Sequence, residues 1–270
     1  MTVTSHPWLN RLLLTYTWAV VLLIFLPPTY LLLISFNPGL LPSLPTLSTF
    51  SLKWYVELIT EERMLDALRA STIVGVVTAA TTTVMALVAA LAYRRLAPQW
   101  QGRFFTLVVF PMFVPGVIQG LALSVIFRIL QIRSSYGTIV AGHLLWSLPF
   151  AFIVVLTSLS VVRTSLGEAA HDLGANEWQV FRDITFPIIR PGVTSAALFA
   201  LLLSFNEFIR AFFLVGGQDT LPIYMFGAMN AGTSPTIYAL AGSILIVSMG
   251  GFAAALYGLT VVRARRRGHA

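Results

Sequence analysis

The stretch EAAHDLGANEWQVFRDITFP, residues 168–187, is polar, although long apolar runs lie on both sides of it. It has a glycine near its middle and a proline at its end, and its charged residues are Glu168, Asp172, Glu177, Arg182 and Asp183. A polar segment between two lipid-compatible segments is expected at an aqueous face of a membrane. The fold and the function of the chain both depend on what this segment contacts.

The chain as a whole has the composition of an integral membrane protein. Of its 270 residues, 57% are hydrophobic and only 10% are charged, and its mean hydropathy is +0.84. Soluble domains are about a quarter charged. We therefore expect an all-α membrane protein in contact with the lipid bilayer. We assign the net charge of +7 to membrane topology and expect no nucleic-acid partner.

Two classes of chemistry are excluded by missing residues. The chain has no cysteine, which excludes disulfides and thiolate metal sites or catalysis. Lys53 is the only lysine and lies outside any Gly-Lys-[Ser/Thr] sequence, so the chain has no P-loop for ATP. The four histidines are scattered, and we predict neither catalytic nor metal-ligating residues.

Six apolar stretches are long enough to cross a hydrocarbon core, which takes about 20 residues. They define a single transmembrane domain over residues 1–270, with predicted spans at 12–36, 69–93, 104–127, 136–160, 192–214 and 236–262. The first apolar run is too long for the core of a signal peptide and lacks a cleavage pattern, so we interpret it as a retained anchor.

Lysine and arginine outside the spans predict the orientation of the chain, because cytoplasmic loops carry most of them. Four basic residues fall on one side: Lys53, Arg63, Arg128 and Arg133. Eleven fall on the other: Arg11, Arg94, Arg95, Arg103, Arg163, Arg182, Arg190, Arg263, Arg265, Arg266 and Arg267. Both termini and the loop 161–191 are therefore predicted to be cytoplasmic.

The opening stretch has the pattern of two short amphipathic helices. Ser165 is a candidate N-cap with Glu168 three residues later, which is the spacing of a capping box. Gly174 is suited to end the first helix. Asn176 is suited to begin the second, and Pro187 to end it.

The polar face of these helices is mixed in charge, with four acidic and three basic residues over 161–190. Helices that lie on anionic lipid usually carry lysine or arginine along their polar face. The mixed face favours docking on a protein partner, while a helix on the lipid surface remains the alternative.

The motif Glu168-Ala169-Ala170, followed by Gly174, Ile184 and Pro187, resembles the EAA signature of permease subunits of binding-protein-dependent ABC importers. One anchor departs from that signature, since Phe186 stands where leucine is usual. The resemblance implies a cytoplasmic coupling helix between spans four and five that docks on a separate ATPase. The residues it assigns to coupling are Glu168, Ala169, Ala170, Asp172, Gly174, Trp178, Ile184 and Pro187.

Further motifs are similar to the second permease subunit of spermidine/putrescine-type importers. They are Leu33-Ile34-Ser35-Phe36-Asn37, Phe50-Ser51-Leu52-Lys53-Trp54-Tyr55, Thr220-Leu221-Pro222-Ile223-Tyr224 and Ser234-Pro235. The resemblance implies a bacterial inner-membrane permease that imports a polyamine or related amine by alternating access. It also implies three partners: an ATPase dimer that binds ATP and Mg²⁺, a second and distinct permease, and a substrate-binding protein. No cofactor is expected in this chain.

The predicted substrate pathway lies in span five. In the polyamine subfamily an acidic pair occupies the position of Asn206 and Glu207, so the resemblance implies that Glu207 faces a cation. However, Arg210 is three residues further on and can pair with Glu207 along a helix. Substrate contact and structural pairing both stay open, and Phe205 and Trp146 are weaker pathway candidates.

Three other expectations follow from the intramembrane residues. Gly116 and Gly120 have the GxxxG spacing of a close helix contact, which suits an interface between permeases. Gly116 also stands where polyamine permeases tend to have an acidic residue, which leaves a zwitterionic or opine-like substrate open. His143 is expected to hydrogen-bond to a neighbouring helix. A stand-alone secondary transporter needs more intramembrane acid–base groups than this chain has.

Overall fold

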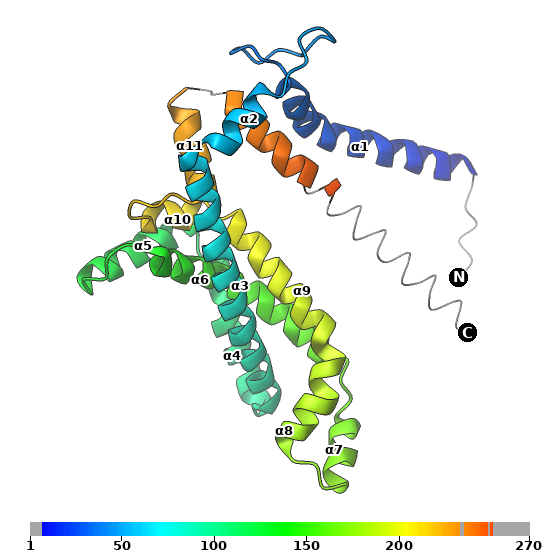
Figure 1. Cartoon of the computed structure of the whole chain (residues 1–270). Helices are drawn as coiled ribbons and strands as arrows, with labels where there is room; N and C mark the ends of the chain where they lie inside the picture. Colours follow the sequence, from blue (N-terminus) through cyan, green and yellow to red (C-terminus); the bar gives the residue numbers. More distant parts are fainter. Residues whose placement is uncertain (1–6, 233–234, 248, 251–270) are drawn as a thin grey trace. The chain divides into compact units, whose positions relative to one another are not determined.

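The structure is a computed structural model that describes residues 7–250 except 233–234 and 248 (Figure 1). All regular elements in this part of the chain are helices, which confirms the predicted all-α class. Among the described residues, four helices are long and apolar enough to cross a membrane, or five if one bent pair counts as a span. The helices belong to two compact units, Met1–Glu62 with Gly227–Ala270, and Arg63–Phe226.

The first unit contains α1 (Pro7–Ile34), α2 (Lys53–Thr60) and a helix at Pro235–Val247. The predicted first span, 12–36, corresponds to α1, whose side chains are almost all exposed, as suits a helix in lipid. Of the predicted sixth span, 236–262, the part beyond residue 250 lies outside the described residues.

The residues that directly follow α1 are anchored by hydrogen bonds to the first turn of α2. The Trp54 indole nitrogen donates to the Asn37 carbonyl at 2.6 Å, and the Ser35 and Tyr55 hydroxyls lie 2.7 Å apart. The Phe36 ring stacks on Phe50 and Tyr55. The motif residues of this region therefore serve local packing.

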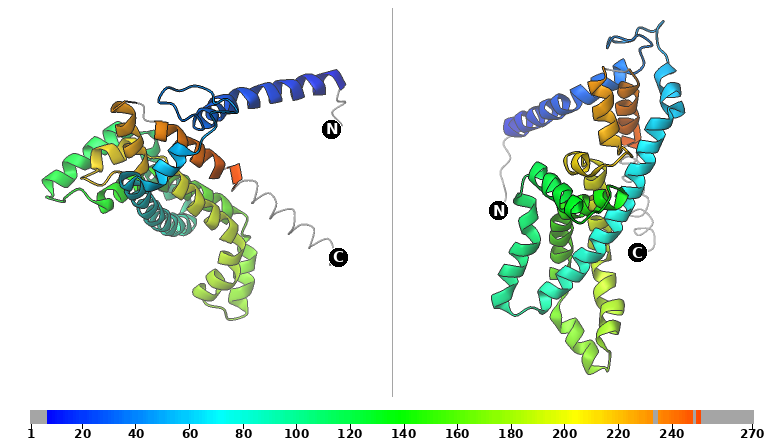
Figure 2. Two further views of the ribbon diagram at one scale, coloured as in Figure 1. Left: turned by 45° about the horizontal axis from the view of Figure 1, so that its top comes forward. Right: turned by 90° about the vertical axis from the view of Figure 1, so that its left-hand side faces the viewer.

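The remaining helices lie in the second unit, except that α3 begins one residue before it and α11 continues beyond Phe226 (Figures 1 and 2). They are α3 (Glu62–Arg95), α4 (Pro98–Val109), η1 (Phe110–Phe113), α5 (Gly116–Ile129), α6 (Tyr136–Ser160), α7 (Thr164–Asp172), α8 (Glu177–Gln179), the π-helical turn η2 (Val180–Thr185), α9 (Phe186–Phe205), α10 (Ile209–Leu214) and α11 (Leu221–Asn230). The bounds of α6 match the predicted span 136–160. Its start is defined by a capping box that Ser135 and Thr138 form. Helices α6 and α9 pack side by side along most of their length.

Helix α3 packs on its neighbours through a stripe of small residues. Its buried positions include Ala67, Ser71, Gly75, Thr78, Thr82, Ala86 and Ala90. Small side chains let helix backbones approach closely, which is how membrane helices associate where lipid is as apolar as leucine. The larger side chains come from the partner helices, with Phe152 of α6 fully buried between rings of α3 and α4.

The predicted span at 104–127 contains a sharp bend. The segment is two helices that meet at 98°, with the bend between Phe113 and Gly116. Val114 is extended, as a residue before proline prefers to be, and Pro115 has no N–H to continue the helix.

The predicted span at 192–214 is also not one helix. The helix that leads into it is continuous from Glu177 to Phe205 and then breaks at 206–208 before α10 begins. Pro187 does not end a helix as predicted. The wider π-helical turn precedes it, with the Phe186 N–H bonded to the Phe181 carbonyl, and this turn accommodates the missing proline N–H.

The GxxxG pair lies at a helix contact within this chain. A Cβ atom at Gly116 would lie 3.1 Å from Arg210 Nη1, and one at Gly120 would lie 2.8 Å from the Phe213 ring. Both glycines therefore allow α5 to approach α10 of the same chain.

The contact of α6 with α9 generates a stability prediction. A Cβ at Gly192 would lie 2.3 Å from Ser158 Cβ, whereas one at Gly102 on α4 would meet nothing within 4 Å. We expect Gly192→Ala to lower the free energy of unfolding by about 1–3 kcal/mol, because it overpacks the helix pair. The control Gly102→Ala should be neutral or stabilising by up to ~1 kcal/mol. Thermal unfolding in detergent, followed by tryptophan fluorescence, checks this; equal effects of the two variants would contradict it.

Candidate functional site

The polar loop projects from the second unit as the pair α7 and α8 at the start of the α9 helix (Figures 1 and 2). Helix α7 begins at Thr164, and its N-cap is Arg163, which makes no side-chain cap. The predicted capping box of Ser165 and Glu168 is therefore wrong. The chain is fixed before this point, since Val162 is buried and Arg94 donates to the carbonyls of Leu159 and Val162.

The bend after α7 confirms what the sequence predicts for Gly174. Its φ is +85°, a left-handed conformation that favours glycine. The Gly174 N–H donates to the His171 carbonyl, and the Ala175 N–H donates to the Ala170 carbonyl, both at 2.9 Å. This pair of bonds is a Schellman motif, which fixes the direction in which the chain leaves the helix.

The second helix begins as predicted at Asn176. Its side chain accepts from the Gln179 N–H at 2.9 Å, and the Gln179 side chain accepts from the Asn176 N–H at 2.7 Å. This reciprocal capping box satisfies two helix-terminal amides. Because the helix then continues without a break into α9, the loop is joined to a membrane helix without a flexible connection.

A second anchor of the loop was not predicted from the sequence. Arg95, at the end of α3, donates to Glu177 Oε2 at 2.5 Å. Glu177 Oε1 lies 3.4 Å from His171 Nε2, and His171 Nδ1 lies 2.8 Å from the Ala175 carbonyl. Residues 82 positions apart meet here, so only the tertiary structure brings them together.

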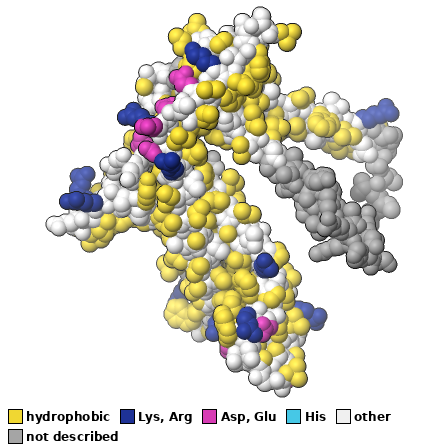
Figure 3. All heavy atoms as spheres, in the orientation of Figure 1, with side chains coloured by type: hydrophobic (Ala, Val, Ile, Leu, Met, Phe, Trp, Pro, Cys, Tyr) yellow, Lys and Arg dark blue, Asp and Glu magenta, His cyan; other side chains and the backbone are white. Residues whose placement is uncertain are grey.

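The outer face of the loop is uncovered. Leu173 is 90% exposed and Trp178 is 63% exposed, although both are large and apolar. Of the predicted coupling residues, the exposed ones are Glu168, Ala169, Asp172, Gly174, Trp178 and Pro187, while Ala170 and Ile184 are half-buried. Figure 3 shows arginine and acidic side chains at this end of the unit and apolar side chains over the helices that lead to it.

The second candidate site is the break at the end of α9, where Glu207 and Arg210 are buried. Arg210 Nη1 donates to Glu207 Oε2 at 2.9 Å. The Arg210 backbone N–H donates to Glu207 Oε1, also at 2.9 Å. Both oxygens of the carboxylate are thus engaged by one residue of the same chain.

Two further side chains complete this cluster. Gln119 of α5 accepts from Arg210 Nε at 2.6 Å, and the Arg210 guanidinium lies 4.6 Å from the centre of the Trp146 ring. A cation over an aromatic face is stabilised, and more strongly when water is excluded. The structure therefore brings together three of the predicted pathway residues and adds Gln119, which the sequence analysis missed.

The other predicted pathway residues lie beside this cluster without joining it. Asn206 is exposed, and its amide donates to the Leu202 carbonyl of its own helix. The Phe205 ring packs close to Gly75 of α3. Both residues flank the break in the helix.

His143 hydrogen-bonds to a neighbouring helix, as predicted. Its Nδ1 lies 2.7 Å from the Ser204 hydroxyl of α9. One turn along α6, Ser147 lies 2.8 Å from the Thr82 hydroxyl of α3. These bonds connect α3, α6 and α9 through polar groups in the core of the unit.

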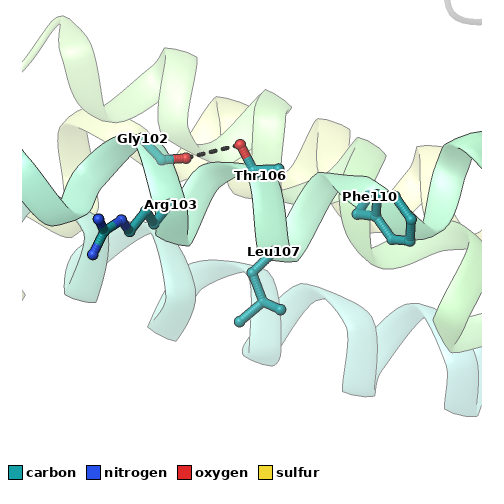
Figure 4. Close-up of a pocket in the computed structure, with 5 residues that line it drawn as sticks. All are labelled: Gly102, Arg103, Thr106, Leu107 and Phe110. Atoms are coloured by element: carbon teal, nitrogen blue, oxygen red, sulfur yellow. Dashed lines mark hydrogen bonds between the residues drawn. The ribbon is translucent and has the colours of Figure 1, made fainter.

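One hollow lies on the surface of the second unit, apart from the two candidate sites. This shallow hollow on α4 and the first residue of η1 is lined by Gly102, Arg103, Thr106, Leu107 and Phe110 (Figure 4). Its one hydrogen bond joins Thr106 to Gly102 within the helix. No cluster of three metal-ligating side chains occurs in the described part of the chain.

The membrane-length helices, and the exposed polar loop at one end of a helix that continues into them, are those of a multi-pass membrane protein. Residues 82–266 match the family described as the binding-protein-dependent transport system inner membrane component. The chain belongs to this family of ABC importer permeases, which confirms the resemblance carried by the EAA motif.

Curated relatives agree with this assignment, and a solved structure has the same fold. The chain is 31% identical over 253 residues to the putrescine transport system permease protein PotI of Escherichia coli strain K12, covering 90% of this chain and 87% of that protein. It is 28% identical to the spermidine/putrescine permease PotC of the same strain, covering 74% and 76%. A bacterial ABC transporter involved in alginate import has the same fold, with a TM-score of 0.71, 18% identity and coverage of 89% and 91%.

The buried ion pair generates a prediction for a double-mutant cycle. Removing one partner leaves the other as an uncompensated buried charge, so Glu207→Gln and Arg210→Met should each lower the free energy of unfolding by about 3–5 kcal/mol. The double variant should lose less than the sum of the two. Thermal unfolding of the purified complex measures the cycle. A Glu207→Gln chain that keeps its stability but loses uptake of a cation would instead assign the carboxylate to substrate.

Proposed function

We propose that this chain is one of two permease subunits of an ATP-driven importer in a bacterial inner membrane. Its spans provide half of a pathway that opens alternately to each side, and both termini face the cytoplasm. A separate binding protein delivers the substrate. A separate ATPase dimer binds ATP and Mg²⁺ and supplies the energy. Membership of the binding-protein-dependent family supports this proposal most directly.

The loop of α7 and α8 is the part that couples ATP hydrolysis to transport. Its support is the combination of an exposed apolar surface at Leu173 and Trp178 with a backbone held in place by Gly174 and Asn176. A surface that must transmit a displacement has to be rigid where it is contacted. Because α8 continues into α9, a movement of the docked loop reaches the membrane helices directly.

A polyamine or related small amine is the proposed substrate. The permeases PotI and PotC, which resemble this chain over most of its length, are named for putrescine and spermidine transport. A cation needs a carboxylate or aromatic face along its path, and Asn206, the Glu207 cluster and Trp146 are the candidates in this chain.

A zwitterionic or opine-like substrate is the second candidate, and one observation favours it. Both oxygens of Glu207 are engaged by Arg210, so this carboxylate offers no free negative charge to a cation. A compound that carries both an amine and an anionic group has no net positive charge. The residues along its pathway therefore do not need a net negative charge.

A thermal-shift screen of the complex with its binding protein separates the two candidates. Polyamines, amino acids, opines and thiamine-like amines are tested one at a time. A shift with putrescine or spermidine alone supports the polyamine assignment. A shift confined to zwitterions would overturn that assignment and leave the importer function standing.

The coupling role of the loop predicts the effect of Gly174→Val. A β-branched residue at a φ of +85° is strained, so we expect the docking helices to shift and ATP hydrolysis to continue with transport reduced by about tenfold or more. Hydrolysis and uptake are measured together in proteoliposomes. Gly167→Ala in α7 is the matched control, since a Cβ there meets only Val180 at 3.6 Å. A fully coupled Gly174→Val complex would refute the role.

A further inference from the structure

We propose that Gln119 and Arg210 are positioning residues that link the bend between α4 and α5 to the break between α9 and α10. Through this link the two interruptions change conformation together during transport. The inference rests on the proposed function, because it assigns a role in the same transport cycle.

A continuous series of hydrogen bonds joins the two interruptions. At one end, Gln119 Nε2 donates to the Pro111 carbonyl at the bend. Gln119 Oε1 accepts from Arg210 Nε, and Arg210 Nη1 donates to Glu207 Oε2. At the other end, Glu207 Oε1 accepts from the Arg210 backbone N–H at the break.

At each end, this series supplies a hydrogen bond to a backbone group. That group has lost its hydrogen-bond partner within the helix because the helix is interrupted. In an uninterrupted helix the Pro111 carbonyl would accept from the N–H of residue 115, but residue 115 is proline. The carbonyl instead accepts from Gln119 and, at 3.2 Å, from the Val114 N–H. Likewise the Arg210 N–H would donate to the carbonyl of residue 206, and it donates to the Glu207 side chain instead.

Burial makes the series a constraint on the geometry of both helices. Gln119, Glu207 and Arg210 are 5%, 7% and 3% exposed, so water does not replace a lost hydrogen bond at low cost. Gly116 brings the α5 backbone close to the guanidinium. A change in the direction of α10 therefore has to carry α5 with it or break a charge-assisted hydrogen bond.

The series also extends the path from the coupling loop. The helix from Glu177 to Phe205 is continuous and ends at the break that contains Glu207. A displacement of the loop thus reaches Glu207 along α9, then Arg210, and then Gln119 on α5. Neither Gln119 nor Arg210 needs to touch substrate for this role.

The test uses Gln119→Leu in the full complex in proteoliposomes, with uptake of radiolabelled putrescine and ATP hydrolysis as readouts. We expect the maximal uptake rate to fall about tenfold while KM for putrescine changes by less than about twofold and hydrolysis continues. Thr157→Val is the control, because it removes a hydroxyl that only bonds within α6. A large rise in KM at unchanged maximal rate would overturn the proposal and make Gln119 a substrate contact.

A second readout does not depend on transport. The chain has no native cysteine, so spin labels at Leu121→Cys on α5 and Leu198→Cys on α9 report the distance between these helices; both positions are exposed. We expect a narrow distance distribution in the parent chain and a broad one after Gln119→Leu. An unchanged distribution would refute the link.

This second readout also separates the link from the proposed function. If the parent complex takes up neither putrescine nor any other compound of the thermal-shift screen, the importer assignment fails while the spin-label result still decides the link. If Gln119→Leu does not assemble, Gln119→Glu replaces it. That variant keeps an acceptor for Arg210 and loses the donor to Pro111, so a broadened distribution is again expected, and an unchanged one again refutes the link.

Discussion

The fold depends on hydrogen-bond partners for the backbone N–H and carbonyl groups that lose their helical partners where membrane helices are interrupted. In a low-dielectric core an unpaired N–H or carbonyl costs several kcal/mol, so a helix break survives only with a substitute partner. Glu207 supplies that partner at one break and Gln119 at another, and Arg210 joins them. An ion pair that a sequence motif associates with substrate therefore has a structural task that is complete without any ligand.

The loop of α7 and α8 is in a different situation, since its residues are mostly exposed and it has little core of its own. Its rigidity comes from local backbone chemistry, the Schellman motif at Gly174 and the capping box at Asn176, and from one long-range contact between Arg95 and Glu177. That surface ion pair contributes only about 0–1 kcal/mol. The local motifs are the main source of order, which leaves the apolar side chains free to meet a partner.

The sequence predicts the features that local chemistry decides. The bounds of α6, the left-handed Gly174 and the Asn176 cap follow from residue types at fixed spacings. Hydropathy finds the apolar stretches but does not show that their helices are interrupted. An apolar stretch has the same mean hydropathy whether its helix is straight or bent at Pro115. The prolines mislead a prediction of helix ends in two ways. A helix ends before Pro115 inside a predicted span, whereas a helix continues through Pro187 after a π-helical turn. The partners Gln119 and Arg210 lie 91 positions apart, so no local pattern joins them.

The close contact of Gly192 with Ser158 divides the helix from α8 to α9 into two arms. Fourteen residues separate Gly192 from Trp178 on one side and from Asn206 on the other, which is about 21 Å in each direction at 1.5 Å per residue. This contact therefore lies midway between the exposed Trp178 and the helix break at Asn206, at equal distance from the two candidate sites.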